Sequence, residues 1–282
     1  EMTSSLVGSE MCIRDSPYYD TGWSRNIVYP NMGFDETHFI DDFDQTKILR
    51  DYITDQELYE KIVDRYESKK SNEDLFIMSI SMQNHGGYTE KYDNFDEKAR
   101  MLGINYPDVN QYLSLIHESD SALEYLISYF EKVDDPVEIV FFGDHQPSLS
   151  SSFYPYLNGK GLGGLTLSEL ENLYTVPFFI WTNYDSGKES VELTSLNYLS
   201  TLALERAGIA LPAYNQFLAD MMEEIPAVNS RGFYSKSQGK FLHVEDAAGE
   251  DAKWLKNYEI LQYNNMFDKR NKSELIFPYL KQ

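Results

Sequence analysis

Two short polar segments directly follow apolar runs and contain the side chains best suited to chemistry. His85 lies in Gln-Asn-His-Gly-Gly, after the apolar run 75–82. Asp144 and His145 lie side by side in Gly-Asp-His, after the apolar run 137–142. A carboxylate and an imidazole are good ligands for a hard or borderline divalent ion. Consecutive ligands at the end of a rigid strand can be aimed at one ion, so the pattern favours a metal site.

The residues alone leave a second explanation open at each position. Asp144 could cap the next helix while His145 is simply hydrogen-bonded, and a single histidine such as His85 is more often structural than functional. A shared site gains support if the runs 75–82 and 137–142 are neighbouring parallel strands, because the ends of such strands lie together. The other histidines have no such context, and we assign them to the surface or to packing: His38, His117 and His243.

A third candidate segment is Gly-Trp-Ser-Arg-Asn at positions 22–26. The guanidinium of Arg25 could hold a phosphate through two parallel hydrogen bonds. Trp23 could form an apolar wall for the group that the phosphate carries. The alternative is a core tryptophan beside a surface arginine.

These segments need a sheet to position them. Strands are expected at three apolar runs: 75–82, 137–142 and 176–182. The stretch 112–132 has apolar residues at helical spacing, which gives the strand–helix–strand pattern of a parallel sheet. Residues 17–43 are aromatic and punctuated by Gly and Pro, which is typical of a loop. Further helices are expected at 55–69, after Thr54 as N-cap, and at 196–207, 214–224 and 253–267.

Composition excludes several classes of protein. The chain has 282 residues and 15% aromatic residues, which indicates a globular protein with one large α/β domain or two small ones. Its formal net charge of -22 argues against binding to nucleic acid and against electrostatic docking on anionic lipid. No run of about 20 apolar residues occurs, so if the parent protein is membrane-anchored, its anchor lies outside this sequence.

The first 16 residues differ from the remainder of the chain. They contain no aromatic residue and no clear period, and they resemble translated sequencing-adapter sequence. We therefore treat 1–16 as a non-native segment and 17–282 as the domain of interest; the alternative is an ordinary flexible terminus. The single cysteine, Cys12, falls in this segment.

Four segments in this order resemble the lipoteichoic acid synthase family over residues 17–282. They are Trp-Ser-Arg at 23–25, Met-Gln-Asn-His-Gly-Gly-Tyr at 82–88, Phe-Gly-Asp-His-Gln-Pro at 142–147 and Val-Pro-Phe-Phe-Ile-Trp-Thr-Asn-Tyr at 176–184. The resemblance implies an alkaline-phosphatase/sulfatase-like α/β fold, with a mixed, mostly parallel sheet flanked by helices. It also implies that this chain is the C-terminal part of an extracellular catalytic domain on a bacterial membrane protein.

The resemblance further implies an activity and a set of roles. Such enzymes move glycerol phosphate from phosphatidylglycerol to a teichoic acid chain or glycan through a covalent phosphothreonine, with one divalent ion that is typically Mn²⁺. By position, Asp144 and His145 are expected to bind the metal. Arg25 and His85 are expected to hold the phosphate, with Trp23 near the glycerol.

The chain also departs from the family pattern. The nucleophilic threonine and another acidic metal ligand are expected upstream of this sequence, and Ser16 stands where a substrate-contacting histidine is expected. We therefore expect the chain alone to be inactive and to bind metal weakly. The alternatives are another enzyme of the same fold (a phosphodiesterase, sulfatase or phosphoethanolamine transferase) and a non-catalytic envelope-binding domain.

Overall fold

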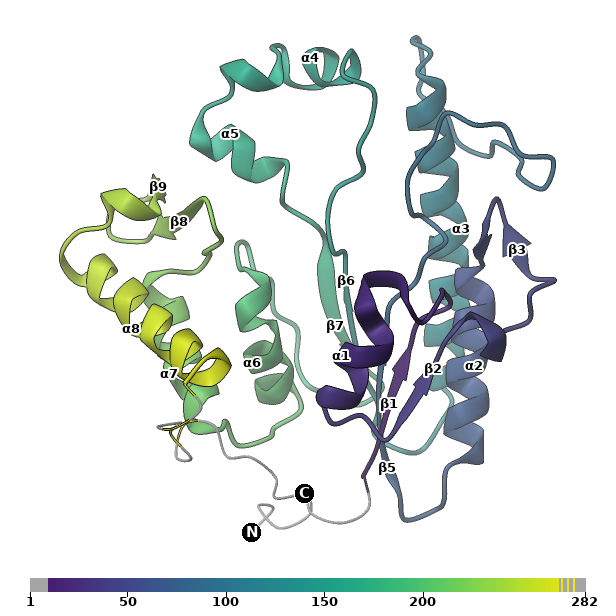
Figure 1. Cartoon of the computed structure of the whole chain (residues 1–282), viewed down its shortest axis with the longest axis horizontal. Coiled ribbons are helices and arrows are strands. Elements are labelled where there is room, and N and C mark those ends of the chain that lie inside the picture. The colour runs from purple at the N-terminus through teal and green to yellow at the C-terminus, as the bar shows by residue number, and fades with distance from the viewer. Residues whose placement is uncertain (1–9, 269, 271–272, 274–275, 277–282) are drawn as a thin grey trace. The chain divides into compact units, whose positions relative to one another are not determined.

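The structure is a computed structural model that describes residues 10–268 together with 270, 273 and 276. The chain forms two compact units, and each is described by itself (Figure 1). Unit 1 comprises residues up to Asp135 and the segment Pro147–Gly159. Unit 2 comprises Pro136–Gln146 and the chain from Lys160 onward. The chain therefore crosses between the units more than once.

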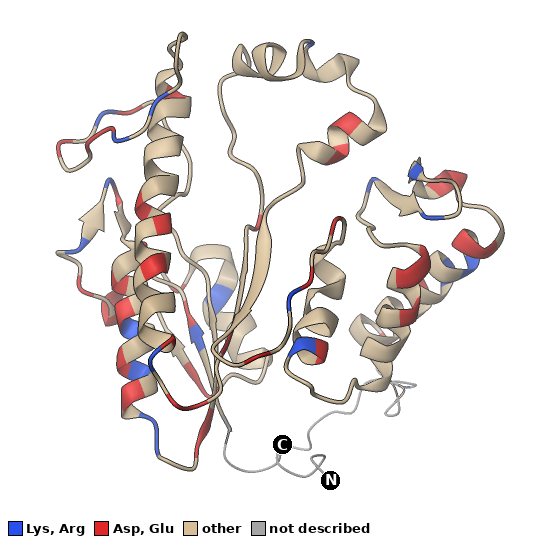
Figure 2. Ribbon diagram, turned by 180° about the vertical axis from the view of Figure 1, so that it is seen from behind, with Lys and Arg blue, Asp and Glu red and all other residues tan. Residues whose placement is uncertain are grey.

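Acidic residues occur along the helices of both units (Figure 2). This distribution agrees with the net charge of -22. Among the described residues, no helix combines the length and the apolar character needed to cross a bilayer.

Unit 1 contains a parallel three-stranded sheet. Its central strand β1 (Glu10–Asp15) lies between β2 (Glu36–His38) and β5 (Asp74–Ser79), and Ile13 pairs with Glu36 on one side and Ile77 on the other (Figure 1). Residues 10–15 thus take part in the sheet, although we had set residues 1–16 aside. Whether that segment is foreign to the natural protein stays a prediction.

Helices and short elements surround this sheet. The long helices α2 and α3 pack along each other (Figure 1). The segment 17–43, expected to be a loop, instead contains a 3-10 turn, a helix, the strand β2 and a second 3-10 turn. The remaining elements of unit 1 are η1 (Gly22–Ser24), α1 (Arg25–Asn31), η2 (Ile40–Asp42), β3 (Ile48–Leu49), β4 (Tyr52–Ile53), α2 (Asp55–Ser68), α3 (Pro107–Phe130) and α4 (Phe153–Asn158).

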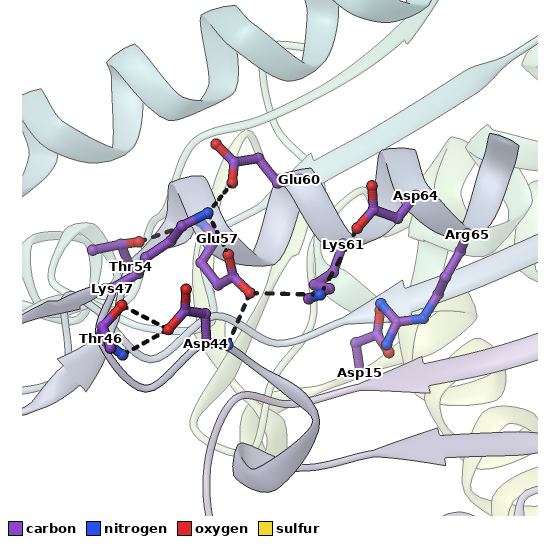
Figure 3. A network of polar contacts seen from close by, with 10 residues as sticks. All are labelled: Asp15, Asp44, Thr46, Lys47, Thr54, Glu57, Glu60, Lys61, Asp64 and Arg65. Carbon is purple, nitrogen blue, oxygen red and sulfur yellow. Dashed lines mark hydrogen bonds and ion pairs between the residues drawn. The ribbon is translucent and has the colours of Figure 1, made fainter. Parts of the chain in front are cut away.

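The start of α2 is fixed by side chains. The Thr54 hydroxyl accepts a hydrogen bond from the Glu57 amide, so the predicted N-cap is confirmed. The buried Glu57 carboxylate accepts from the amide of Asp44 at 3.0 Å and pairs with Lys47 at 2.9 Å (Figure 3). At the other end of the helix, Arg65 pairs with Asp15 of β1 at 2.9 Å. These contacts attach α2 to the sheet and to the loop before it.

Unit 2 contains an antiparallel pair, β6 (Glu138–Phe142) and β7 (Phe178–Thr182). Phe141 stacks on Phe179 with ring centroids 5.2 Å apart. The condition that would support a shared site, pairing of the runs 75–82 and 137–142 as parallel strands, is not met among the described strand pairs, since β5 pairs with β1 and β6 pairs with β7. Both runs are strands, but apolar character alone does not specify a strand's partner or its direction.

The rest of unit 2 is largely helical. Tyr198, Leu218, Met221, Ile225 and Phe233 form its buried core. The helix after β7 ends at Arg206, and Gly208, two residues later, has a φ of +70° that favours glycine. The remaining elements are η3 (Leu162–Gly164), α5 (Leu167–Asn172), α6 (Leu196–Arg206), α7 (Ala213–Glu224), β8 (Gly232–Ser235), β9 (Lys240–His243), η4 (Val244–Asp246) and α8 (Gly249–Met266). The molecule is thus an α/β protein with parallel and antiparallel pairs, as predicted.

Candidate functional site

The turn that leads into α1 reverses the usual burial of its two largest side chains. Trp23 and Ser24 have φ values of 52° and 55°, in the left-handed region that non-glycine residues rarely adopt. Trp23 is 61% exposed, whereas Arg25 is only 5% exposed. The alternative of a core tryptophan and a surface arginine is therefore wrong. Strained backbone of this kind costs roughly 1–3 kcal/mol per residue and is concentrated at functional sites.

Arg25 is a buried cation without a counter-charge. Its guanidinium carbon lies 4.5 Å from the centroid of the Trp23 ring and 5.7 Å from that of Tyr18. Nη2 lies 3.8 Å from the sulfur of Met82, and Nη1 is buried without a hydrogen-bond partner. Burial lowers the pKa of Arg25. No ion pair within the described part of the chain includes Arg25, so the site favours an anionic ligand.

His85 lies beside this arginine site. Its ring centroid is 5.9 Å from that of Trp23 and 5.7 Å from that of Tyr52. The Tyr52 hydroxyl oxygen lies 3.2 Å from His85 Nδ1, and the imidazole is exposed. The structure therefore brings together the three residues that the sequence proposed for substrate binding: Trp23, Arg25 and His85.

Two tyrosines complete the wall of the site. The Tyr18 ring lies 5.5 Å from Trp23 and 6.3 Å from Tyr52. Sequence reasoning missed both as site residues. Tyr18 stands five positions before Trp23 in an aromatic stretch, which is a weak signal, and Tyr52 belongs to no motif.

Ser16 occupies the position at which a substrate-contacting histidine was expected. It is 0% exposed, its amide donates to the carbonyl of His38 at 3.0 Å, and its hydroxyl has no partner. Serine lacks the imidazole that the family pattern implies at this position.

Asp144 and His145 lie in unit 2, at the end of β6. Their side chains are 77% and 71% exposed, and Asp144 Oδ2 lies 3.6 Å from His145 Nε2. Asp144 does not cap a helix, because it accepts from the His145 amide and the next helix in the chain begins at Phe153. Asp144 and His145 belong to unit 2, whereas Arg25 and His85 belong to unit 1. A single pocket that contains all four residues therefore stays a prediction.

The donors of this pair suit a divalent ion in kind. An exposed carboxylate and an exposed imidazole are ordinary ligands, but structural and catalytic sites commonly need three or four. The described residues contain no group of three or more side chains that could hold a metal. Asp144 and His145 therefore fit as part of a ligand set.

Comparison with known proteins settles the family. The sequence profile of the sulfatase family matches residues 15–209, well over half of the chain. The chain belongs to the sulfatase family. All five predicted site residues fall within the matched range of the chain: Trp23, Arg25, His85, Asp144 and His145. Members of the sulfatase superfamily generally depend on a metal.

Two proteins of Rhizobium meliloti strain 1021 resemble this chain in sequence. One, named "Putative cyclic beta-1,2-glucan modification protein", is 22% identical over 93% of the chain. The other, the capsular polysaccharide biosynthesis protein RkpI, is 34% identical over 50% of the chain. The chain spans 41% and 24% of the lengths of these relatives.

Two solved structures share the sulfatase fold of the chain. The phosphoglycerol transferase GacH of Streptococcus pyogenes, in complex with sn-glycerol-1-phosphate, has a TM-score of 0.67 at 19% identity, covering 93% of this chain and 63% of GacH. The lipoteichoic acid synthase LtaP of Listeria monocytogenes has a TM-score of 0.60 at 16% identity, covering 91% and 70%. The predicted resemblance to lipoteichoic acid synthases is thus confirmed at the level of the fold.

Proposed function

We propose that this sulfatase-family chain is the C-terminal part of a metal-dependent phosphoglycerol transferase of the lipoteichoic acid synthase type. It moves glycerol phosphate from phosphatidylglycerol to an envelope polymer or glycan at the extracellular face of a bacterial membrane. The observation that carries the proposal is the buried, unpaired guanidinium of Arg25 beside Trp23 and His85. A cation held in this state is stabilised when a phosphate takes the place of the missing counter-charge.

Different side chains of unit 1 contact the phosphate and the glycerol of the ligand. Arg25 Nη1 and an N–H of His85 donate to phosphoryl oxygens. The faces of Trp23, Tyr18 and Tyr52 enclose the carbon skeleton of the glycerol, and their rings exclude water from the arginine. A small polyol phosphate suits a site with one buried cation and an aromatic rim.

The metal belongs to the second pair of residues. Asp144 would supply a carboxylate oxygen and His145 an imidazole nitrogen to a divalent ion, which we propose is Mn²⁺. When bound, the ion would neutralise charge on a phosphoryl group. The remaining acidic ligand and the nucleophilic threonine would come from sequence outside residues 17–282. We therefore expect no turnover of a phosphatidylglycerol analogue by this chain with Mn²⁺; measurable turnover would contradict that part of the proposal.

The relatives support an envelope acceptor. One is named for the modification of a cyclic glucan and another for capsular polysaccharide biosynthesis. GacH was solved with sn-glycerol-1-phosphate. These names favour glycerol phosphate as the transferred group and a glycan or teichoic acid as the acceptor.

Calorimetric titration with sn-glycerol-1-phosphate tests the proposal. We expect the wild-type chain to bind it, and Arg25→Met to weaken binding at least tenfold because the guanidinium that pairs with the phosphate is lost. Arg231→Met is a matched control, since Arg231 also lies over an aromatic ring, 4.2 Å from Tyr174, but belongs to unit 2. Equal affinities for wild type and Arg25→Met would refute the assignment. Stronger binding of phosphoethanolamine or of a sulfate ester would instead favour one of the other activities of this fold.

A further inference from the structure

The loop that carries His85 is held from behind by one buried side chain. Arg50 is 4% exposed and donates to three backbone carbonyls of the loop: Gln83 at 3.0 Å, His85 at 2.6 Å and Gly87 at 3.0 Å. It also donates to Gln111 Oε1 of α3 at 3.1 Å. The loop is therefore wrapped around a single guanidinium, whose planar fork of donors can serve several acceptors at once.

The position of Arg50 is itself strained. It lies between β3 and β4 and has a φ of 55°, which is uncommon for a residue with a long side chain. The Asn94 side chain donates to the carbonyl of Arg50 at 3.0 Å. A hairpin turn normally places glycine, asparagine or aspartate in such a conformation. The contacts of the guanidinium give a reason for an arginine here.

The same hairpin also reaches the imidazole. Tyr52, two residues after Arg50, places its hydroxyl 3.2 Å from His85 Nδ1. The other contact of Nδ1 is the carbonyl of Gly86 at 3.3 Å. A carbonyl can only accept, whereas the tyrosine hydroxyl can donate. When Tyr52 donates to Nδ1, the proton of the neutral imidazole sits on Nε2, where it can be donated to a ligand.

We infer that the hairpin β3–β4 positions His85 for substrate: Arg50 fixes the backbone of the loop, and Tyr52 fixes the ring orientation and the Nε2–H tautomer. Arg50 and Tyr52 are thus positioning residues for the phosphate-binding histidine. This inference rests on the proposed function, because it assigns His85 a phosphoryl oxygen as its partner.

The Tyr52→Phe variant tests the tautomer directly. It keeps the aromatic ring and removes only the hydroxyl, so Gly86 O becomes the remaining partner of Nδ1 and the proton is expected to move from Nε2 to Nδ1. Long-range ¹H–¹⁵N correlation spectra of the neutral imidazole report which nitrogen carries the proton. We expect affinity for sn-glycerol-1-phosphate to fall about fivefold to tenfold. Tyr92→Phe is the control, because the Tyr92 ring also lies against Arg50, at 5.8 Å, whereas its hydroxyl hydrogen-bonds with Asp51.

The Arg50→Lys variant tests the backbone role. Lysine keeps the charge but lacks the planar fork, so the amide signals of residues 83–87 should shift and affinity should again fall.

An unchanged tautomer together with unchanged affinity in Tyr52→Phe would overturn the inference. If the wild-type chain binds no glycerol phosphate but Tyr52→Phe still moves the proton, the positioning role stands and the proposed function fails. If the wild type binds and neither variant changes binding or spectra, the proposed function stands and the positioning role fails.

Discussion

Arg25 and Arg65 are both arginines of unit 1, but they differ in their partners. Arg25 is buried with an unpaired Nη1, whereas Arg65 pairs with the fully buried Asp15 at 2.9 Å. Desolvation of an unpaired cation opposes folding, while removal of one partner of a buried pair leaves the other charge uncompensated. We expect Arg25→Met to leave the free energy of unfolding unchanged or to raise it by about 1 kcal/mol. Arg65→Met should lower it by about 3–5 kcal/mol. Urea unfolding measures both, and a similar loss in the two variants would show that Arg25 is a structural residue.

A second residue-scale prediction concerns Asp55, at the start of α2. Burial raises its pKa from the usual 3.8 to about 6, although the Ser119 hydroxyl donates to Oδ2 at 2.5 Å. Between these values the folded protein holds more protons than the unfolded chain, so stability falls as pH rises from about 4 to about 6. The difference corresponds to about 3 kcal/mol.

The Asp55→Asn variant should remove this contribution. Its unfolding free energy at pH 8 should exceed that of the wild type, and the fall between pH 4 and 6 should become shallower. Asp64→Asn, on the exposed side of the same helix, serves as control and should keep the wild-type slope. Urea midpoints measured across this pH range decide the matter, and a parallel slope in Asp55→Asn would count against a buried, protonated Asp55.

At the scale of the element, the cap of α2 allows a direct test. The Thr54 hydroxyl accepts from the Glu57 amide at 3.2 Å. Loss of this acceptor in Thr54→Ala should lower the free energy of unfolding by about 1 kcal/mol, because an amide at the helix start loses its partner. Thr54→Ser keeps the hydroxyl and should stay within a few tenths of a kcal/mol of the wild type. Thermal unfolding of the three proteins checks the order, and equal losses would mean that the methyl group matters instead.

The elements that the sequence predicted are those with a strong local signal. The helices α2, α3, α6, α7 and α8 have apolar residues at helical spacing or clear end signals, and β5, β6 and β7 are continuous apolar runs. The strand β1 has neither feature. Its last two residues, Arg14 and Asp15, and the following Ser16 are all buried, and each has a polar atom without a partner. A strand of this composition is held by its neighbours in the sheet, which a local pattern does not show.

The sequence pointed to the motif residues of the candidate site but not to the residues that hold them in place. Trp23, Arg25 and His85 stand in short segments with a family likeness, and the structure groups them. Arg50 and Tyr52 lie more than 30 positions before the loop that they hold. Their contacts depend on how the hairpin β3–β4 packs, so spacing along the chain gave no signal. The inverted burial of Trp23 and Arg25 likewise follows from the left-handed turn before α1.

At the scale of the whole molecule, chain connectivity limits what the sequence can show. Each unit is built from segments that are discontinuous in the chain. The antiparallel pairing of β6 with β7 joins residues about 40 positions apart across a stretch that contains elements of both units. Apolar runs give the strands themselves, whereas the partner of each strand is set by the path of the chain between them.

The excess of acidic residues governs the response of the whole molecule to salt. With 46 acidic and 24 basic residues, like charges repel one another in the compact state, and this repulsion lowers its stability. Raising NaCl from about 10 mM to about 150 mM shortens the Debye length from roughly 30 Å to roughly 8 Å. Screening should therefore raise the free energy of unfolding, by on the order of 1 kcal/mol. The pair of the buried Glu57 with the exposed Lys47 weakens less than repulsion between two exposed charges does, because burial of one partner reduces screening.

Urea midpoints measured at pH 7 across this range of NaCl test the effect, and the same series near the isoelectric point of about 4.5 provides the control. There the net charge is close to zero, the repulsion is gone and only the ion pairs remain to be screened, so salt should leave the midpoint unchanged or lower it. A midpoint at pH 7 that falls with salt would mean that favourable ion pairs outweigh the excess of negative charge. The direction in which salt moves the wild-type urea midpoint thus shows whether repulsion between acidic residues or attraction within ion pairs dominates in the folded chain.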